Sequence, residues 1–579
     1  MPAPPTRRSF LLTGIAGAVA PLAAHAPAPA SATADRARGA AEPAPSPAPE
    51  APRASSSGRS SPYPFTLGVA SGDPAADGFV IWTRLAPEPL AEDGLGGMPY
   101  RAVPVAWEVA ADERFRRVVR RGTHQARPEW GHSVHVELRG LSPGRDYWYR
   151  FKTGGHLSPS GRTRTAPHPA TYGPPLTMVF ASCANYEHGH FTAYRRLAEQ
   201  EPDLVLHLGD YIYEHGHGHG VPPGVRHPVR HHEGPETETL AGYRRRYAQY
   251  KTDPDLRLAH AAAPWIVVWD DHEVDNNWAA GVPHERSPTP PEHFAERRAA
   301  AFRAYYENMP LRRPSAPRGP GMRLHRRVRW GRLAAFHMLD TRQYRHDQCC
   351  GDGFRHCPEA ADPARSILGP EQERWLLDGL RANRPRWDIL GQQVFFAQRD
   401  ADAGPLKVTS QDAWDGYTAS RARITRGWTE AGVRNAVVLT GDVHSHWAAE
   451  LKTDYDDPDS RCVGAELVTT SISSGGDGRD IDQAADPFLA VNPHLRYHDA
   501  RRGFVRTRIT RGSLTADFIG LPYVSTPGAP ARLQARFVIE DRVPGLHRTY
   551  LRPLDPPPPP RPRADLVDQT IKEETGPGE

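Results

Sequence analysis

The sequence predicts an α/β fold, and two observations support this class. Short continuous apolar runs, which are typical of parallel strands buried on both faces, alternate with helix-like stretches. Four of these runs end in side chains that can bind a metal, and open α/β sheets place their chemistry at the carboxyl ends of such strands. The runs are residues 179–185, 204–213, 266–273 and 436–446, and helix-like stretches include 191–200, 292–308 and 371–382.

The length and charge of the chain exclude some classes of protein. With 579 residues, more than one domain is expected. The net charge of +4, from 72 basic and 68 acidic residues, gives no case for specific nucleic-acid binding. Beyond the N-terminus no segment resembles a transmembrane helix. We expect a monomer that acts on a small molecule, although the sequence does not fix the oligomeric state.

The N-terminus predicts export from the cell. Thr6–Leu12 has the pattern of a twin-arginine signal, residues 15–24 are apolar, and residues 30–32 form a small-residue cleavage site. A membrane anchor is the alternative, but the apolar stretch is too short to span a bilayer comfortably. Residues 1–32 are therefore interpreted as a signal peptide for the twin-arginine export machinery. That route carries folded proteins, which suits an enzyme that acquires its metal before secretion.

Differences in composition and pattern divide the rest of the chain into a linker, two domains and a tail. Residues 33–61 are rich in Ala, Pro, Ser and Gly and are expected to be a disordered linker. Residues 62–167 contain short alternating segments separated by turns, which predict a small β-sandwich similar to a fibronectin type III module. The α/β catalytic domain is expected over residues 176–545, followed by a Pro-rich and then charged tail at 553–579.

Five cysteines suit an oxidising destination with few disulfides. Cys349, Cys350 and Cys357 lie in one loop, and Cys462 lies far from them. One bridge between two of these four is expected, but the sequence does not give the pairing. Cys183 differs from the others because it ends a predicted strand.

One group of side chains favours a strongly Lewis-acidic ion. Asp210 follows a glycine at a strand end, where its two oxygens can bridge two cations, and Tyr213 lies three residues further on. A phenol, with a normal pKa of about 10, binds as phenolate only to such an ion. Cys183 adds a thiolate and His444 an imidazole. This donor set favours iron(III), Fe(3+), with zinc as the weaker alternative.

A second group of side chains supplies oxygen atoms as possible metal ligands. Asp271 and Asp442 are carboxylates at strand ends, and Asn185 and Asn276 are nearby amides that are possible metal or substrate ligands. Together with the bridging Asp210 they predict a hard site, suited to calcium, Ca(2+), or to magnesium or manganese. The number of calcium ions stays open.

Two further residues are predicted to act in catalysis. His272, next to Asp271, can orient the substrate or protonate a leaving oxygen. Arg342 is a candidate for bidentate contact with phosphate. In contrast, the alternating His-Gly segment around His215, His217 and His219 is interpreted as a solvated loop rather than a second metal site.

The joint order of these motifs resembles that of the PhoD-like alkaline phosphatases and phosphodiesterases, a group within the calcineurin-type metallophosphoesterases. The resemblance covers roughly residues 63–545 and includes the Gly-Asp-x-x-Tyr element that purple acid phosphatases share. It implies a four-layer α/β/β/α sandwich preceded by a β domain, and a secreted hydrolase of phosphate esters that uses Fe(3+) and Ca(2+). The segments that carry it are 77–84, 180–185, 207–214, 269–277, 339–345, 392–396, 440–444 and 475–478.

The resemblance also implies a division of the ligands between the ions. Iron is expected to be held by Cys183, Asp210, Tyr213 and His444, and the partner ion by Asp210, Asp271 and Asp442. The chain departs from the broader superfamily in that Asp442 replaces the first histidine of Gly-His-x-His and Asp271 replaces the asparagine of Asn-His-Glu. Both departures exchange neutral ligands for carboxylates, which favours calcium over zinc. His446 has no clear counterpart and is expected to support a ligand.

The expected reaction is the hydrolysis of phosphate monoesters and diesters by a metal-activated hydroxide. A secreted phospholipase D-like phosphodiesterase is the alternative within this chemistry. The alternative of another class is an exported phosphate- or metal-binding protein without catalysis.

Overall fold

The computed structural model describes residues 62–218, 228–382, 384–457 and 459–554. The predicted signal peptide and linker, and the tail from residue 555, lie outside these ranges. All described residues belong to one compact unit, Ser61–Glu579.

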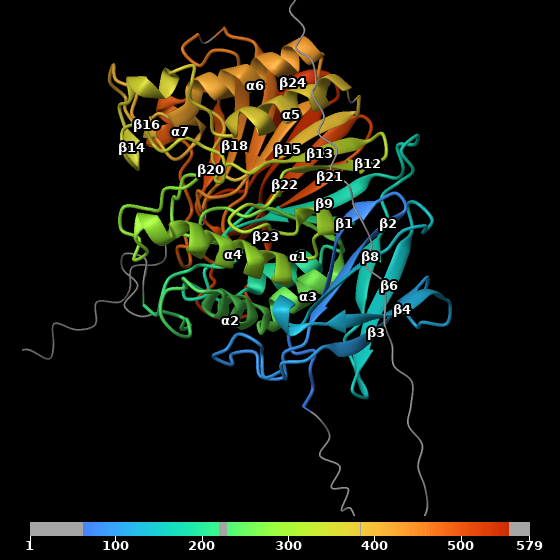
Figure 1. The fold of residues 1–579 in the computed structure, drawn as a ribbon. Helices are drawn as coiled ribbons and strands as arrows, with labels where there is room; N and C mark the ends of the chain where they lie inside the picture. Colours follow the sequence, from blue (N-terminus) through green and yellow to red (C-terminus); the bar gives the residue numbers. More distant parts are fainter. Residues whose placement is uncertain (1–61, 219–227, 383, 458, 555–579) are drawn as a thin grey trace, which may run out of the picture. The chain divides into compact units, whose positions relative to one another are not determined.

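A ten-stranded mixed sheet forms the first of two large sheets (Figure 1). Its strands are β1 (Val69–Ala75), β2 (Gly78–Arg84), β5 (Ser133–Glu137), β9 (Leu176–Ala181), β10 (Leu204–His207), β11 (Trp265–Val267), β21 (Arg502–Ile509), β22 (Ser513–Leu521), β23 (Arg532–Glu540) and β24 (Val543–Leu551). Their order is β24-β23-β22-β21-β9-β10-β11-β1-β2-β5. The centre is parallel, because β10 pairs in parallel with β9 on one side and with β11 on the other.

A seven-stranded sheet forms the second. Its strands are β12 (Arg326–Trp330), β13 (Ala334–Met338), β15 (Trp387–Gly391), β17 (Ala436–Thr440), β18 (His446–Lys452), β19 (Cys462–Val468) and β20 (Leu495–Asp499). The order is β12-β13-β15-β17-β19-β18-β20, and the four strands from β13 to β19 in this order are parallel. The continuous apolar run at Ala436–Thr440 is buried throughout, as a central parallel strand requires.

Helices lie on the outer faces of the two sheets. They are α1 (Thr192–Ala198), α2 (Leu240–Lys251), α3 (Pro254–Ala262), α4 (Phe294–Asn308), α5 (Gly369–Ala382), α6 (Thr418–Ala431) and α7 (Pro487–Val491). The helices predicted over 191–200, 292–308 and 371–382 are confirmed as α1, α4 and α5. Short 3-10 helices are η1 (Pro128–Trp130), η2 (Pro291–His293), η3 (Arg313–Ser315), η4 (Pro358–Ala361) and η5 (Trp414–Tyr417).

The packing of these elements gives the four layers that the resemblance implied. On β17, Val438 packs with α5 and α6, whereas Val437 and Leu439 belong to the core shared with the first sheet. On the far side of the first sheet, Trp269 stacks on Phe302 of α4 with ring centroids 4.2 Å apart. Figure 1 shows α5 and α6 together over the second sheet and α1, α3 and α4 together beside the first.

The N-terminal region is sandwich-like but shares a sheet with the α/β core. A separate sheet of five strands is formed by β3 (Val103–Ala110), β4 (Val118–Ala126), β6 (Asp146–Thr153), β7 (His156–Leu157) and β8 (Gly161–Arg164). It packs through a common apolar core against β2 and β5. Both β2 and β5 are part of the ten-stranded sheet. β5 pairs with β2, β2 pairs with β1, and β1 pairs in parallel with β11 at Gly72 and Trp265. A two-stranded sheet of β14 (Phe354–Arg355) and β16 (Thr409–Ser410) completes the strands.

Within the part of the chain that is described, no helix combines the length and the apolar character needed to cross a membrane.

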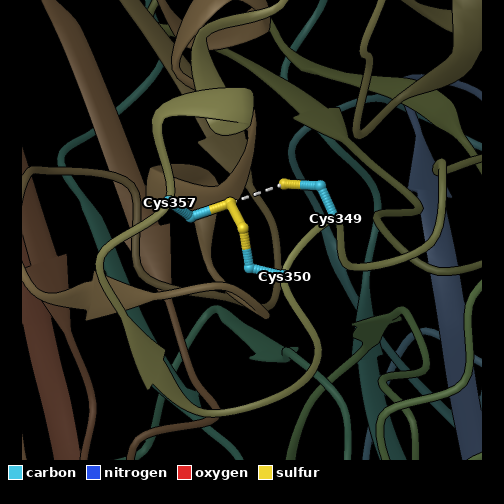
Figure 2. Close-up of side chains that lie close together, drawn as sticks. All are labelled: Cys349, Cys350 and Cys357. Atoms are coloured by element: carbon cyan, nitrogen blue, oxygen red, sulfur yellow. Dashed lines mark hydrogen bonds between the residues drawn. A yellow bond between two sulfur atoms is a disulfide. The ribbon is translucent and has the colours of Figure 1, made fainter.

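The structure gives the cysteine pairing that the sequence left open. Cys350 and Cys357 form a disulfide, whereas Cys183, Cys349 and Cys462 are free (Figure 2). The Sγ atom of Cys349 lies 3.1 Å from the Sγ atom of Cys357 (Figure 2). A thiol at this distance from a disulfide can exchange with it.

Replacing Cys349 by serine is expected to fix this pairing. In the wild type the Cys349 thiolate can form a bond to Cys357 while Cys350 leaves as a thiolate, so peptide mapping without reduction should find both linkages at mildly alkaline pH. The C349S variant should show only the linkage of Cys350 to Cys357, whereas a C462S control should show both. A wild-type protein that holds a single linkage after long incubation would exclude the exchange.

Candidate metal centre

Loops at the carboxyl ends of strands from both sheets meet at one place. Cys183 follows β9, Asp210 follows β10, Asp271 follows β11, and Asp442 follows β17. Two glycines allow the close approach of these loops. A Cβ atom on Gly209, whose φ is +111°, would lie 2.4 Å from Cβ of Asp270, and one on Gly441 would lie 2.8 Å from Cβ of Ser182. The glycine before each aspartate is therefore required by packing.

Four of the predicted ligands have a left-handed backbone. The φ angles are +61° at Cys183, +53° at Asp210, +62° at Asp442 and +53° at His444. Residues other than glycine seldom adopt this region, and it costs about 1–3 kcal/mol where they do. The surrounding structure therefore holds these four side chains in place at the expense of backbone strain.

The residues predicted to bind iron lie together around Tyr213. Its hydroxyl donates to Oδ2 of Asp210 at 3.0 Å and lies 3.1 Å from Nε2 of His444. Ligand atoms of Cys183, Asp210 and His444 all lie within 4.8 Å of one another. Ser474, which the sequence analysis did not single out, donates to the tyrosine oxygen at 2.7 Å.

The carboxylates predicted to bind calcium lie on the other side of Asp210. Ligand atoms of Asp210, Asp271 and His272 lie within 4.8 Å of one another. Nη2 of Arg342 lies 3.6 Å from Oδ1 of Asp271 and 3.8 Å from Oδ1 of Asp442, so these two carboxylates face the same group. Oδ1 of Asp210 and Oδ1 of Asp271 are buried, and neither has a hydrogen-bond partner in the described part of the chain.

The two predicted amide ligands are less directly placed. Asn185 is buried, and its Oδ1 accepts from the backbone N–H of Glu187 at 2.9 Å, so this oxygen stabilises its own loop. The backbone N–H of Asn276 donates to Oε1 of Glu214 at 2.9 Å, which fixes the position of that residue but not of its amide. A ligand role for either side chain stays a prediction.

Arg342 is surrounded by carboxylates rather than open to solvent. Its side chain is fully buried; Nε donates to Asp270 at 2.5 Å and Nη1 to Asp412 at 2.9 Å. Only Nη2, which faces Asp271 and Asp442, lacks a hydrogen-bond partner among the described residues. The contacts of Arg342 therefore hold the acidic cluster together, and the direct phosphate contact stays a prediction.

Glu273 organises the backbone of the site, a role that sequence reasoning missed. Its buried carboxylate accepts from the backbone N–H groups of Asp210 at 3.0 Å, Tyr211 at 2.6 Å and Asp270 at 2.8 Å. It therefore connects the loop after β10 to the loop after β11. The only signal in the sequence is its place directly after Asp271-His272.

His272 is held by Glu214, which was also missed as a functional residue. Oε2 of Glu214 lies 2.7 Å from Nδ1 of His272, and the Glu214 side chain is almost fully buried. Burial alone lowers the pKa of His272, but Glu214, Asp271 and Asp210 outweigh it and hold the pKa well above its usual value. Glu214 thus orients the imidazole and leaves Nε2 as the nitrogen that can face a substrate.

His446 supports the site from behind the ligands. Its Nδ1 accepts from the backbone N–H of Thr470 at 3.1 Å, and Nε2 lies 3.2 Å from the carbonyl oxygen of Ile519. Thr470 in turn donates to the carbonyl oxygen of His444 at 3.1 Å. The imidazole therefore helps to hold the loop that carries His444.

Burial dominates the acid–base behaviour of the ligands. It raises the pKa of Cys183 and of Tyr213 well above their usual values, and the carboxylate of Asp210 raises both further. Burial and the neighbouring Asp271 raise the pKa of Asp210, and burial lowers the pKa of His444 to about 3. Without a cation the thiol and the phenol stay protonated, so only a bound cation favours the thiolate and the phenolate.

The residues present therefore fit a mixed metal centre. A thiol, a phenol, an imidazole and a carboxylate lie together, and buried carboxylate oxygens without partners lie next to them. Such a concentration of buried acids is costly unless cations compensate it.

Comparisons with known proteins assign the chain to a family. Residues 178–518 match the family model of the PhoD-like phosphatase, and residues 50–167 match that of the PhoD-like phosphatase N-terminal domain. The chain belongs to the PhoD-like phosphatase family. Every predicted metal ligand and both predicted catalytic residues of this PhoD-like chain lie within the first of these ranges.

Two similar proteins support the same assignment. The PhoD-like chain is 49% identical to alkaline phosphatase D of Bacillus subtilis (strain 168) over 489 residues, which cover 84% of this chain and 83% of that protein. It also matches a solved structure described as the structure of PhoD, with a TM-score of 0.82 and 48% identity over 85% of this chain and 94% of the other. The predicted family, fold class and phosphatase activity are thereby confirmed.

Proposed function

We propose that this PhoD-like phosphatase hydrolyses phosphate monoesters and diesters at a centre of Fe(3+) and Ca(2+). The observation that carries the proposal is the position of the Tyr213 hydroxyl, which lies within 3.1 Å of both a carboxylate and an imidazole. A buried phenol among acidic groups is a poor choice for magnesium or calcium alone and a good one for a ferric ion.

The ligands divide between the two kinds of ion. Iron would be held by Cys183, Asp210, Tyr213 and His444, and calcium by Asp210, Asp271 and Asp442. When bound, the ions supply Lewis acidity to the phosphoryl oxygens and lower the pKa of water. Arg342 keeps two of the calcium ligands in place, because its Nη2 lies within 3.8 Å of both Asp271 and Asp442.

His272 is the residue that handles the proton of the leaving group. Its Nδ1 faces Glu214, so Nε2 is available to protonate the departing alcohol oxygen. The Tyr213 and His272 rings lie with centroids 4.0 Å apart, which places this proton donor beside the iron ligands.

Replacing Tyr213 by phenylalanine tests the iron assignment. The purified wild type is expected to show a visible tyrosinate-to-iron absorption band, and elemental analysis should find iron and calcium. The Y213F variant should lose this band and at least about tenfold in activity, because a ligand to the ion is gone.

Tyr194→Phe is the matched control for this experiment. Its hydroxyl is also buried and lies 2.8 Å from Nε2 of His207, and it forms no hydrogen bond with a predicted ligand. The Y194F protein should therefore keep the band. A colourless wild type that is fully active with zinc or magnesium alone would remove the basis for iron.

Replacing Glu214 by glutamine tests the role of His272. Glutamine keeps an oxygen for the backbone N–H of Asn276 but removes the charge that orients and polarises the imidazole. We expect kcat to fall about 10–100-fold with little change in KM. The loss should be larger for alkyl phosphates, whose leaving groups need a proton, than for nitrophenyl phosphates.

Glu236→Gln is the control for Glu214→Gln. The Glu236 carboxylate contacts Arg297 at 2.9 Å and is not hydrogen-bonded to His272. Its replacement should leave kcat unchanged. Equal losses for good and poor leaving groups in the E214Q variant would argue against proton donation by His272.

The substrate class needs a direct comparison of esters. We expect a soluble monoester and a soluble diester to be cleaved, and phosphatidylcholine to be cleaved poorly. A strong preference for phosphatidylcholine would favour the phospholipase D-like alternative, and hydrolysis of none of the three would favour a binding protein.

We also propose that the chain is exported by the twin-arginine route and acts as a monomer outside the cytoplasm. The pattern at Thr6–Leu12 supports export. Exchange of both arginines for lysine should retain the enzyme inside the cell, and light scattering of the secreted protein should give the mass of one chain.

A further inference from the structure

A second cluster of metal-binding side chains lies apart from the residues of the catalytic centre. It consists of Glu187, His217 and His231, whose ligand atoms all lie within 4.8 Å of one another. Glu187 belongs to the connection between β9 and α1, and the two histidines belong to the segment between β10 and α2. The cluster therefore joins two loops that are distant in the sequence.

Glu187 is the buried part of this cluster. Its side chain has no exposed surface, and Oε1 and Oε2 accept from the backbone N–H of Gly218 at 3.1 and 3.0 Å. Oε1 also accepts from the backbone N–H of His232 at 2.9 Å. These bonds fix the carboxylate in one orientation, as a preformed ligand requires.

The Arg246 guanidinium acts electrostatically on Glu187 but forms no ion pair with it. Among the residues that the structure describes, no lysine or arginine forms an ion pair with it. The nearest ring nitrogens are Nδ1 of His217 at 3.3 Å and Nδ1 of His232 at 3.9 Å. A buried carboxylate of this kind favours a bound cation.

The two histidines complete a donor set for a transition metal. The His217 and His231 rings have centroids 4.5 Å apart and are inclined by 68°, so they meet edge to face beside the carboxylate. The side chain of His217 is 58% exposed, which leaves room for water as a further ligand. Two imidazoles and one carboxylate with an open position suit zinc, whereas calcium and magnesium prefer oxygen donors alone.

We propose that Glu187, His217 and His231 bind a divalent transition-metal ion of the zinc class. This site revises the interpretation of the His-Gly segment as a solvated loop for His217; His219 of the same segment lies outside the described residues. The ion would clamp the segment after Glu214 to the loop that follows Cys183. The clamp is close to the catalytic loops, because the backbone N–H of Tyr213 donates to the hydroxyl of Tyr250 at 3.1 Å, and that hydroxyl lies 3.0 Å from Nε2 of His232.

The test counts zinc in the complete protein. The iron- and calcium-loaded enzyme is equilibrated with Zn²⁺, freed of unbound metal and analysed by elemental mass spectrometry. The wild type should hold one more zinc ion per chain than the H217A/H231A double variant. In crystals, an anomalous peak at the zinc edge should lie between Glu187 and the two histidines.

His293→Ala is the matched control for exposed histidines. The His293 side chain is 62% exposed and lies 3.7 Å from Glu296, whose side chain is 84% exposed, so it pairs an imidazole with a carboxylate that is not buried. The H293A variant should hold as much zinc as the wild type, and Glu187→Gln should lose the ion as the double variant does. Equal zinc in the wild type and the double variant, or an anomalous peak at the catalytic centre alone, would overturn the proposal.

The same experiment on the Asp210→Asn variant separates this site from the catalytic one. That variant should keep the zinc held by Glu187 and the two histidines while its phosphatase activity is lost. The zinc count does not depend on the iron and calcium assignment, so either proposal can fail while the other stands.

Discussion

Replacing Asp210 by asparagine is expected to remove nearly all phosphatase activity while stabilising the metal-free protein. Asparagine has the same shape and tolerates the left-handed backbone at this position, where φ is +53°. It cannot, however, supply the charge of a bridging carboxylate. Loss of an ion that contributes several kcal/mol to the transition state lowers kcat by about 10³-fold or more.

The stability of the metal-free D210N protein should increase, whereas its activity falls. In the absence of metal the Asp210 carboxylate is buried beside Asp271, and burial together with this repulsion raises its pKa. At pH 8 this carboxyl is ionised in the unfolded state, whereas the folded state must either bury the charge or take up a proton. The group therefore destabilises the folded state, and a neutral amide removes that cost. The Tm of the metal-stripped variant should exceed that of the metal-stripped wild type.

Asp388→Asn is the control for both measurements. Asp388 is also buried on a central strand, and its Oδ1 lies 3.1 Å from Nε2 of His337. It is the second residue of β15, whereas the predicted ligands follow the carboxyl ends of their strands. This variant should keep its metals and its activity. A D210N enzyme that binds both kinds of ion and retains full activity would contradict the bridging role.

Replacing Arg342 by methionine is expected to destabilise the metal-free protein severely. The guanidinium lies within 3.8 Å of the carboxylates of Asp270, Asp271, Asp412 and Asp442. Removal of this cation leaves buried like charges without compensation, and a loss of about 3–5 kcal/mol in the free energy of unfolding is typical of a broken buried pair. Denaturant unfolding of the stripped variant measures this loss.

The R342M experiment also distinguishes a supporting role from phosphate contact. If Arg342 only contacted phosphate, KM would rise and stability would stay constant. We expect both stability and metal affinity to fall, and Arg342→Lys to recover only part of each because lysine lacks the planar fork. Arg381→Met, which breaks an exposed pair with Asp378, should cost no more than about 1 kcal/mol.

That the predicted ligands lie together could be expected from the sequence because of how parallel sheets are built. Cys183, Asp210, Asp271 and Asp442 each follow a continuous apolar run, and the carboxyl ends of such strands share an edge. Their separation along the chain is therefore compatible with their proximity in space. The division of these residues between iron and calcium rests on residue type and stays a prediction.

Other parts of the site could not be predicted, because they depend on contacts between distant loops. Asp412 belongs to none of the predicted motifs, and it joins the centre through Arg342, whose Nη1 lies 2.9 Å from its Oδ1. The Glu187 carboxylate meets His217 through folding of a long connection, which the alternating His-Gly pattern does not reveal. The alternating segments of the N-terminal region predict strands, but they do not predict that β1 would pair with β11.

The left-handed backbone at four of the predicted ligands restricts how the metal preference of the proposed centre could change in evolution or in the laboratory. At Cys183, Asp210, Asp442 and His444, a new ligand must both donate to the ion and adopt a positive φ. Asparagine, aspartate and histidine meet both demands far more readily than glutamate or a β-branched residue. Changes of metal preference should therefore occur through exchanges among these three residue types, such as Asp442→His, rather than through substitution by any residue.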